Sequence, residues 1–316
     1  MKWLSDEKLN RLQTIVNEPD FSATKYTFVK ELGRGGMGTV YLAEDRELNR
    51  LVAIKVLNTP DITDDLGRRM IREAQIIAGL EHPGIVPVHD VGTLADGRIF
   101  YAMKFVRGLR LDEYAAQGAS FRDRLRKFQA VCDAVAFAHA HGVIHRDLKP
   151  QNIMIGSFGE VLVLDWGIAK TKSQFHQSVP KNPRSSALTE TQDGTVIGTR
   201  DYMSPEQARG EIDQIDQRSD VYSLGAVLQF LIADNATKPA KAICSKAMSD
   251  TPASRYTSAT ELSADIGRLL DAEPVMAYRE NAVERVSRWV SKNRFLVLLV
   301  LAYLLMRIFL IFTSRS

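Results

Sequence analysis

Cysteine is scarce in this sequence: Cys132 and Cys244 are the only two among 316 residues. Two cysteines so far apart in a chain of this length exclude a disulfide framework and favour a reducing compartment for the main body. The first eight residues are charged and lack the apolar run of a signal peptide, so we expect the N-terminus to stay in the cytoplasm.

An excess of either charge is absent as well. Lys and Arg total 41 against 38 Asp and Glu, a formal net charge of +3 at pH 7, which is too small to indicate a nucleic-acid partner. Internal repeats and low-complexity tracts are also missing. With 45% hydrophobic and 25% charged residues, the composition is that of a globular chain long enough for two packed lobes.

The hydrophobic pattern changes character near residue 105. Before it, residues 26–105 are strand-rich, with short runs at 27–29, 40–42 and 52–54 and one helix at about 64–80. After it, helices dominate: residues 219–232 predict a buried helix, and the clearest helical face carries Phe121, Leu125, Phe128, Cys132 and Val135. Residues 1–25 form an N-terminal extension that contains one short amphipathic helix at most.

A long apolar run lies near the end of the chain. Residues 295–312 contain one charge, Arg307, and 14 of the 18 are Leu, Val, Ile or Phe. A helix of this length spans roughly 27 Å, enough for a bilayer core, so we interpret it as a transmembrane helix, with a buried tail helix as the alternative. Because basic residues concentrate in the linker 273–294, the positive-inside rule places that linker in the cytoplasm and residues 313–316 outside.

A glycine-rich stretch lies between the first two strand runs. Its candidate phosphate-facing residues are Gly33, Arg34, Gly35, Gly36, Met37, Gly38 and Val40. Glycines let a backbone approach phosphate oxygens, and the strand that follows them disfavours a dinucleotide fold, in which a helix would follow. Further along, Lys55 ends a strand from which it can reach such phosphates, and Glu73 on the predicted helix is its natural ion-pair partner.

The most specific pattern is His145-Arg146-Asp147-Leu148-Lys149-Pro150-Gln151-Asn152, followed 13 residues later by Asp165-Trp166-Gly167. Phosphoryl transfer needs a carboxylate that faces the attacking hydroxyl and oxygen ligands for magnesium, and this spacing supplies both. With these motifs the chain resembles a bacterial, eukaryotic-like (Hanks-type) serine/threonine protein kinase over about residues 26–270. Residues 198–206, residues 219–225 and Arg255 stand in the order that such kinases show.

The resemblance implies an α+β, bilobal fold with a β-rich N-lobe at 26–105 and an α-helical C-lobe at 106–272. It implies that Asp147 is the catalytic base, that Lys149 stabilises the transferred phosphoryl group, and that Asn152 and Asp165 bind magnesium. Lys55 and Glu73 become the orienting ion pair. ATP is the implied cosubstrate, with Mg²⁺, or Mn²⁺ in its place, as the metal.

The adenine site follows from the same resemblance. Met103 falls where the residue that guards the adenine pocket sits, Lys104 to Val106 form the hinge, and Ala53 lines the pocket from the strand that carries Lys55. The form of the catalytic loop, Leu148-Lys149-Pro150, implies protein substrates with Ser or Thr acceptors.

Three departures from the family pattern bear on function. Trp166 replaces the usual Phe, and Ser204 replaces the usual Ala beside Glu206, which we expect to pair with Arg255. The C-lobe is also short after Asp220, and the Gly-x-x-Pro-Phe segment with its following helix is missing. This shortening leaves a pseudokinase-like ATP-binding scaffold as the alternative function. A small-molecule phosphotransferase is disfavoured by Lys149-Pro150 and the complete 202–206 segment.

The segment between Asp165 and Glu206 is long and rich in Ser, Thr, Gln and Asn. In kinases with an Arg before the catalytic Asp, here Arg146, a phosphothreonine on this segment pairs with that Arg. We therefore expect autophosphorylation at Thr191, with Thr189 and Thr195 as alternates, and a homodimer is a candidate for the reaction in trans. Together with the C-terminal helix, the resemblance predicts a single-pass protein of the bacterial inner membrane whose kinase domain is cytoplasmic.

Overall fold

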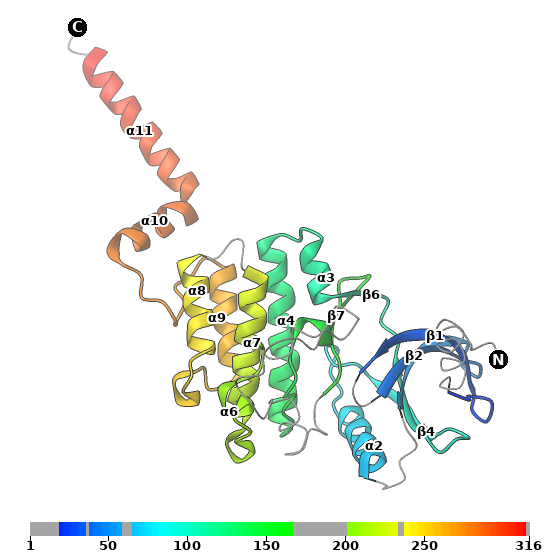
Figure 1. Ribbon diagram of the computed structural model, residues 1–316. Coiled ribbons are helices and arrows are strands. Elements are labelled where there is room, and N and C mark those ends of the chain that lie inside the picture. The colour runs from blue at the N-terminus through cyan, green and yellow to red at the C-terminus, as the bar shows by residue number, and fades with distance from the viewer. Residues whose placement is uncertain (1–18, 36–37, 59–64, 167–200, 233–236, 314–316) are drawn as a thin grey trace, which may run out of the picture.

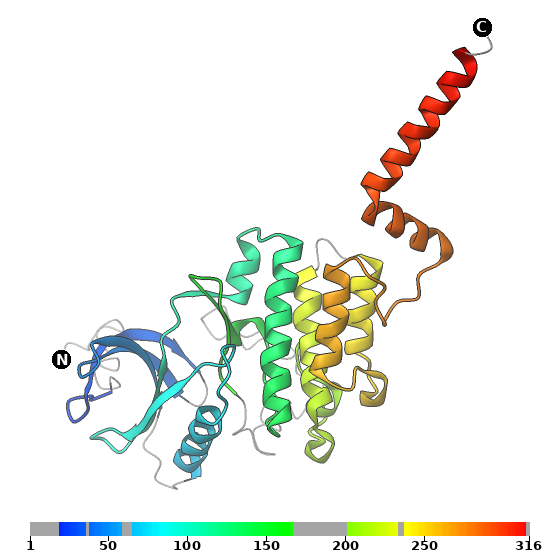
Figure 2. The ribbon, with the colours of Figure 1, turned by 180° about the vertical axis from the view of Figure 1, so that it is seen from behind.

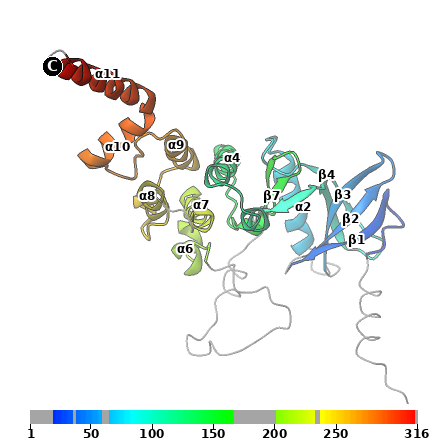
Figure 3. The same ribbon diagram turned by 90° about the horizontal axis from the view of Figure 1, so that it is seen from above.

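The structure is a computed structural model that describes residues 19–35, 38–58, 65–166, 201–232 and 237–313. These residues form a sheet-rich lobe from the first part of the chain and a helical lobe from the second, with α2 (Asp65–Ala78) and β7 (Ile153–Gly156) between them (Figure 3). The predicted bilobal α+β fold is confirmed. The short helix predicted before Pro19 lies outside the described residues.

The N-lobe is built on an antiparallel sheet in the order β1-β2-β3-β5-β4. Its strands are β1 (Tyr26–Arg34), β2 (Gly38–Asp45), β3 (Arg50–Leu57), β4 (Val88–Thr93) and β5 (Ile99–Lys104). The three strand runs expected from the sequence fall within β1, β2 and β3. A smaller sheet, β6-β7-β8, is formed by β6 (Gly108–Arg110), β7 and β8 (Val161–Val163).

The side chains of β3 alternate between the two faces of the sheet, and this places Lys55 in the space between the lobes. Successive side chains of a strand point to opposite faces. One set packs into the core on one face of the sheet: Val52, Ile54 and Val56. Ala53 and Leu57 pack on the other face, together with residues of α2. Lys55 lies between them in the sequence and therefore points toward α2.

The C-lobe is a helical bundle around one large core. Its elements are α3 (Leu111–Ala116), α4 (Phe121–Ala140), η1 (Pro150–Asn152), α6 (Pro205–Ala208), η3 (Ile212–Gln214), α7 (Gln217–Ile232), α8 (Lys238–Ala247), η4 (Pro252–Ser254) and α9 (Ala259–Leu270). The predicted stripe on α4 is confirmed, since Leu125, Phe128, Cys132 and Val135 are fully buried. Phe121, the first residue of the stripe, is only half-buried. The predicted central helix is α7, which ends at Ile232, shortly before α8 begins.

Two further helices follow the bundle, α10 (Ala282–Lys292) and α11 (Arg294–Thr313). Figures 1 and 2 show α11 projecting away from the C-lobe, with α10 lying across its base. Helix α11 covers the predicted segment 295–312, and its side chains are described at Phe295 and over residues 297–307. Over the part of the chain that the structure describes, no helix combines the length and the apolar character needed to cross a membrane.

Candidate active site

Lys55 lies at the centre of a charged cluster between the lobes. Its Nζ is 3.2 Å from Glu73 Oε1 and 3.1 Å from Asp165 Oδ1. Glu73 is 4% exposed because it shares the buried face of α2 with Met70 and Ile77, three residues before and four residues after it. A buried carboxylate needs a partner, so the ion pair joins α2 to β3. The pair expected from the sequence is present, and it also contacts Asp165.

The electrostatics of this cluster keep both charges in place. Burial lowers the pKa of Lys55, but interactions with Tyr101, Asp165 and Glu73 outweigh it and raise the pKa well above its usual value. The charge of Lys55 lowers the pKa of Asp165, although burial opposes the shift. Lys55 is therefore an ammonium and Asp165 a carboxylate at neutral pH.

Asp147, Lys149 and Asn152 form a second cluster on the loop before β7. Asp147 Oδ2 is 3.2 Å from Lys149 Nζ and accepts a hydrogen bond of 3.2 Å from Asn152 Nδ2. The same Nδ2 donates to the backbone oxygen of Asp147 at 2.8 Å. The loop is short because Pro150 begins the 3-10 helix η1, which returns Asn152 to Asp147. A carboxylate, an ammonium and an amide thus converge at one place.

Asp220 of α7 anchors the start of this loop through hydrogen bonds to its backbone. Its two carboxylate oxygens accept 2.8 Å hydrogen bonds from the backbone N–H groups of His145 and Arg146, and His139 Nε2 lies 2.8 Å from Oδ2. Arg146 has a φ of 67°, an unfavourable value for a non-glycine residue. The anchoring by Asp220 therefore supports a strained backbone directly before Asp147.

The donor sets of Asn152 and Asp165 fit a divalent cation. The amide nitrogen of Asn152 is engaged by Asp147, while its Oδ1 accepts no hydrogen bond from a described residue. Asp165 gives one oxygen to Lys55, which leaves Oδ2 without a partner among the described residues. Mg²⁺ and Mn²⁺ prefer such oxygen ligands, so these two residues are suited to hold the metal that phosphoryl transfer needs.

The glycine-rich loop is described at both of its ends. Around Gly33 an added Cβ would meet nothing within 4 Å, whereas at Gly38 it would lie 2.4 Å from the backbone oxygen of Val56. Gly33 therefore faces open space that phosphates can use, and Gly38 is required by the close approach of β3. Gly36 and Met37 lie outside the described residues, and Arg34 pairs with Glu31 at the exposed edge of β1.

The predicted adenine-pocket residues lie together. Ala53, Met103 and Val106 share one apolar cluster, and Val40 packs against it. The N–H of Lys104 donates to the oxygen of Pro87 at 3.0 Å, so it is not available to a ligand. Within the described residues Val106 N–H donates to no backbone oxygen, so it is available to a ligand.

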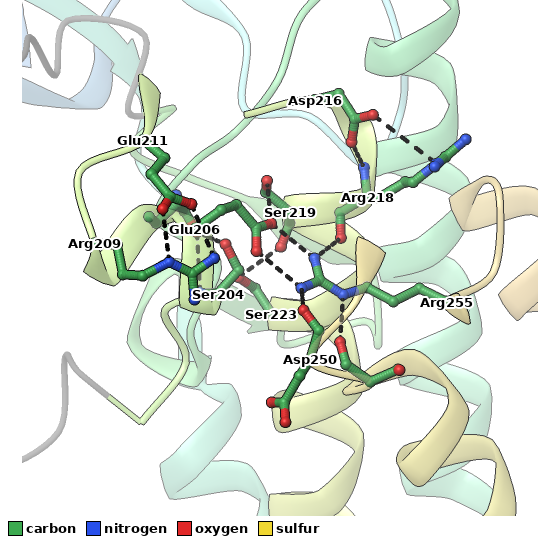
Figure 4. Close-up of polar contacts among 12 residues, drawn as sticks. Ser204, Glu206, Arg209, Glu211, Asp216, Arg218, Ser219, Ser223, Asp250 and Arg255 are labelled. Carbon is green, nitrogen blue, oxygen red and sulfur yellow. Dashed lines mark hydrogen bonds and ion pairs between the residues drawn. The ribbon is translucent and has the colours of Figure 1, made fainter. Parts of the chain in front are cut away.

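Glu206 and Arg255 form a buried ion pair that braces the C-lobe (Figure 4). Arg255 Nη1 and Nη2 lie 2.7 and 2.8 Å from the two carboxylate oxygens, and the side chains are 0% and 1% exposed. The pair predicted from the sequence is present. Thr189, Thr191 and Thr195 fall outside the described residues.

Two side chains near Lys55 were not identified from the sequence. Tyr101 donates its hydroxyl to Glu73 Oε1 at 3.1 Å, and Lys55 Nζ lies 5.6 Å from the centre of its ring. Asn58 donates to the oxygen of Gly35 at 3.1 Å and accepts from Thr39 at 2.7 Å, so it supports the glycine-rich loop. Both contacts depend on strand register, which the local sequence pattern does not specify.

The Tyr101 hydroxyl is expected to contribute measurably to stability. Tyr101→Phe keeps the ring and removes one hydrogen bond to a charged, buried acceptor, so the free energy of unfolding should fall by about 1.5–3 kcal/mol. Chemical denaturation would measure the change. Tyr41→Phe is the matched control, since Tyr41 is buried in the same lobe and its hydroxyl bonds to no described residue. Equal stability losses in both variants would contradict this role for Tyr101.

Comparisons with known proteins agree with this geometry. The family model "Protein kinase domain" matches residues 26–271. The serine/threonine-protein kinase PknD of Protochlamydia amoebophila is 38% identical over 227 residues, which cover 66% of this chain and 23% of that protein. PknB of Mycobacterium tuberculosis is 36% identical over 296 residues, 81% of this chain and 44% of that protein.

Solved structures give the same result. The crystal structure of the Mycobacterium tuberculosis PknI kinase domain matches with a TM-score of 0.58 and 27% identity, over 78% of this chain and 96% of that one. The chain spans between about a quarter and under a half of the length of the curated relatives it matches.

Proposed function

The chain belongs to the protein kinase family, and we propose that it transfers the γ-phosphoryl group of ATP to Ser or Thr hydroxyls of proteins. One observation carries the proposal. Lys55 is paired with both Glu73 and Asp165, while Asp147, Lys149 and Asn152 converge on the neighbouring loop. A chain that only bound nucleotide would not need the second cluster.

In the proposed reaction the substrate hydroxyl oxygen attacks the γ-phosphorus of ATP. A new O–P bond forms, the bond from the γ-phosphorus to the bridging oxygen breaks, and ADP leaves. Asp147 accepts the hydroxyl proton, Lys149 faces the transferred group, and Lys55 orients the phosphates. A metal bound by Asn152 and Asp165 would neutralise part of the negative charge of the phosphates.

The loop from Asp147 to Asn152 bears on two further questions: which hydroxyl accepts the phosphate, and whether the chain is instead a pseudokinase-like scaffold. Lys149 lies 3.2 Å from Asp147 and belongs to the sequence Leu148-Lys149-Pro150. This form of the catalytic loop favours Ser and Thr as phosphate acceptors. A pseudokinase-like scaffold would bind ATP without turnover, and the complete set of charged residues argues against it. The chain is short between α7, which ends at Ile232, and α8, which begins at Lys238, and we expect substrate docking to differ from that of the family there.

Phosphate transfer from radiolabelled Mg-ATP to a generic basic protein tests the proposed function. Lys55→Met is expected to lower the label by about 10²–10³-fold, because a preorganised cation that faces the phosphates is lost. Lys30→Met, on exposed β1, is the matched control and should keep full activity. Absence of label in the wild type, with ATP still bound, would establish the scaffold instead.

We also propose that the segment between Asp165 and Glu206 is autophosphorylated at Thr191, with Thr189 and Thr195 as alternates. One copy of a homodimer would phosphorylate the other. Support comes from Arg146, whose buried Nε has no hydrogen-bond partner among the described residues. A phosphate would supply that partner. Phosphopeptide mapping after incubation with Mg-ATP should find the modification, and three unmodified threonines would contradict it.

Membrane anchoring is a further part of the proposal. The sequence of residues 295–312 supports it, and so do the exposed side chains of α11, among them Phe295 at 77%, Leu299 at 68% and Leu305 at 67%. An apolar helix that no described element covers is unfavourable in water. We therefore place the helix in the inner membrane as a single span, with the kinase domain on the cytoplasmic side.

A further inference from the structure

Helix α10 has an exposed apolar face. Val283, Val286, Trp289 and Val290 are 78%, 62%, 54% and 38% exposed, and Ala282 lies on the same side. At 100° per residue these five positions fall within an arc of about 120°, which is the width of an apolar stripe that normally faces a core. Here the described residues leave the stripe uncovered.

Polar side chains of α10 contact the C-lobe and the linker that precedes the helix. Glu284 is 2.7 Å from Lys238 of α8 and accepts a hydrogen bond of 3.0 Å from the Tyr278 hydroxyl. Arg288 Nε is 2.9 Å from Glu280. Because these contacts occupy the polar face, the apolar stripe is directed away from the C-lobe.

The short connection between α10 and α11 indicates which surface the apolar stripe of α10 contacts. Only Asn293 separates the two helices, and α10 lies across the base of α11 (Figures 1 and 2). We propose that α10 is an in-plane membrane helix whose apolar face enters the headgroup boundary of the bilayer that α11 spans. This inference rests on the proposed membrane anchoring.

The composition of α10 and its flanks fits a lipid surface. Trp289 is a residue type that concentrates at membrane interfaces, and a helix of this kind sinks about 5–10 Å into the boundary between headgroups and acyl chains. Arg279 and Arg285 are exposed and have no ion pair within the described residues, so they are available to anionic headgroups. The contacts of Glu284 with Lys238 and of Arg288 with the backbone oxygen of Ala272 would then place the C-lobe beside a helix that lies in the membrane plane.

Cysteine labelling of the full chain in phosphatidylcholine/phosphatidylglycerol vesicles tests the proposal. A fluorophore is placed at Val286→Cys on the apolar face, at Ser287→Cys on the polar face, or at Leu301→Cys within α11. The native Cys132 and Cys244 are buried, and burial raises the pKa of Cys132 and raises that of Cys244 to about 12, so both thiols react slowly. Quenching by lipids that carry a nitroxide on the acyl chain is measured for each label.

The expected result is quenching at position 286 about threefold stronger than at position 287, with position 301 quenched most. Equal, weak quenching at 286 and 287 with strong quenching at 301 would overturn the in-plane helix and leave the anchor intact. Weak quenching at 301 would overturn the anchor and this inference with it. Protection of position 286 from aqueous iodide without lipid quenching would assign the stripe to a second copy of the chain and also overturn the proposal.

Discussion

Asp147→Asn is expected to lower the rate of phosphate transfer by about 10²–10⁴-fold and to leave ATP affinity near the wild-type value. The amide has the shape of the carboxylate, so the loop should keep its conformation, but it cannot accept the hydroxyl proton. The residues proposed to bind ATP and metal, Lys55, Asn152 and Asp165, are unchanged. The measurement is kcat with the basic protein as substrate, together with nucleotide binding by calorimetry.

The control for this prediction is a second Asp→Asn change far from the loop. Asp271, at the end of α9, is exposed and makes no side-chain hydrogen bond or ion pair with the described residues, so Asp271→Asn should have wild-type kinetics. If Asp147→Asn retained the wild-type kcat, Asp147 would lose its role as the base. If ATP binding fell in parallel with kcat, the loss would be one of site structure, since Asn152 also bonds to Asp147.

Much of the fold and of the candidate site could be predicted because the information is local. The strand runs of the N-lobe and the stripe on α4 depend on side-chain periodicity within one element. The loop from Asp147 to Asn152 depends on a contiguous motif in which Pro150 begins a short helix. The pair of Lys55 and Glu73 joins two elements through residues 18 positions apart, and it is predicted from the phosphoryl-transfer motif pattern rather than from local periodicity.

The contacts that escaped prediction join residues distant in sequence. Tyr101 reaches Glu73 because β3 and β5 pair with Lys55 opposite Tyr101, and such a register is set by the whole sheet. Asp220 belongs to a recognised motif, yet its hold on His145 and Arg146 depends on how α7 packs beneath the loop. Trp166, which replaces the usual Phe, is fully buried, but its Nε1 has no hydrogen-bond partner among the described residues.

Breaking the buried pair of Glu206 and Arg255 is expected to cost about 3–5 kcal/mol of folding free energy, because one charge is left buried and uncompensated. Arg255 also donates to the backbone oxygens of Ser249, Arg218 and Asp250 at 2.7, 3.0 and 3.2 Å, so it ties α7 and the turn after α8 to α6. Thermal and chemical denaturation of Glu206→Gln and Arg255→Met would measure the loss. The double variant should cost less than the sum of the single losses, since the two side chains interact directly.

The neighbouring pair of Arg209 and Glu211 is the matched control (Figure 4). Its atoms are as close, at 2.8 Å, but its side chains are 55% and 33% exposed. Exposed ion pairs are screened by water and contribute little, so Glu211→Gln should not change stability measurably. A loss as large as that of Glu206→Gln would show that burial is not what makes the Glu206 pair important.

The pKa of Glu206 determines how its contribution to stability changes with pH. Burial raises the pKa of Glu206, but hydrogen bonds from Arg255 and Ser219 outweigh it and lower the pKa from its ordinary 4.5 to about 2. A carboxylate with a depressed pKa binds its proton more readily when the chain unfolds, so its stabilisation is complete above pH 4.5 and is lost as the pH falls toward 2. The stability difference between wild type and Glu206→Gln should therefore be constant near neutrality and narrow in acid. A difference that stayed constant through this range would mean that Glu206 does not titrate with folding and that its contribution is packing alone.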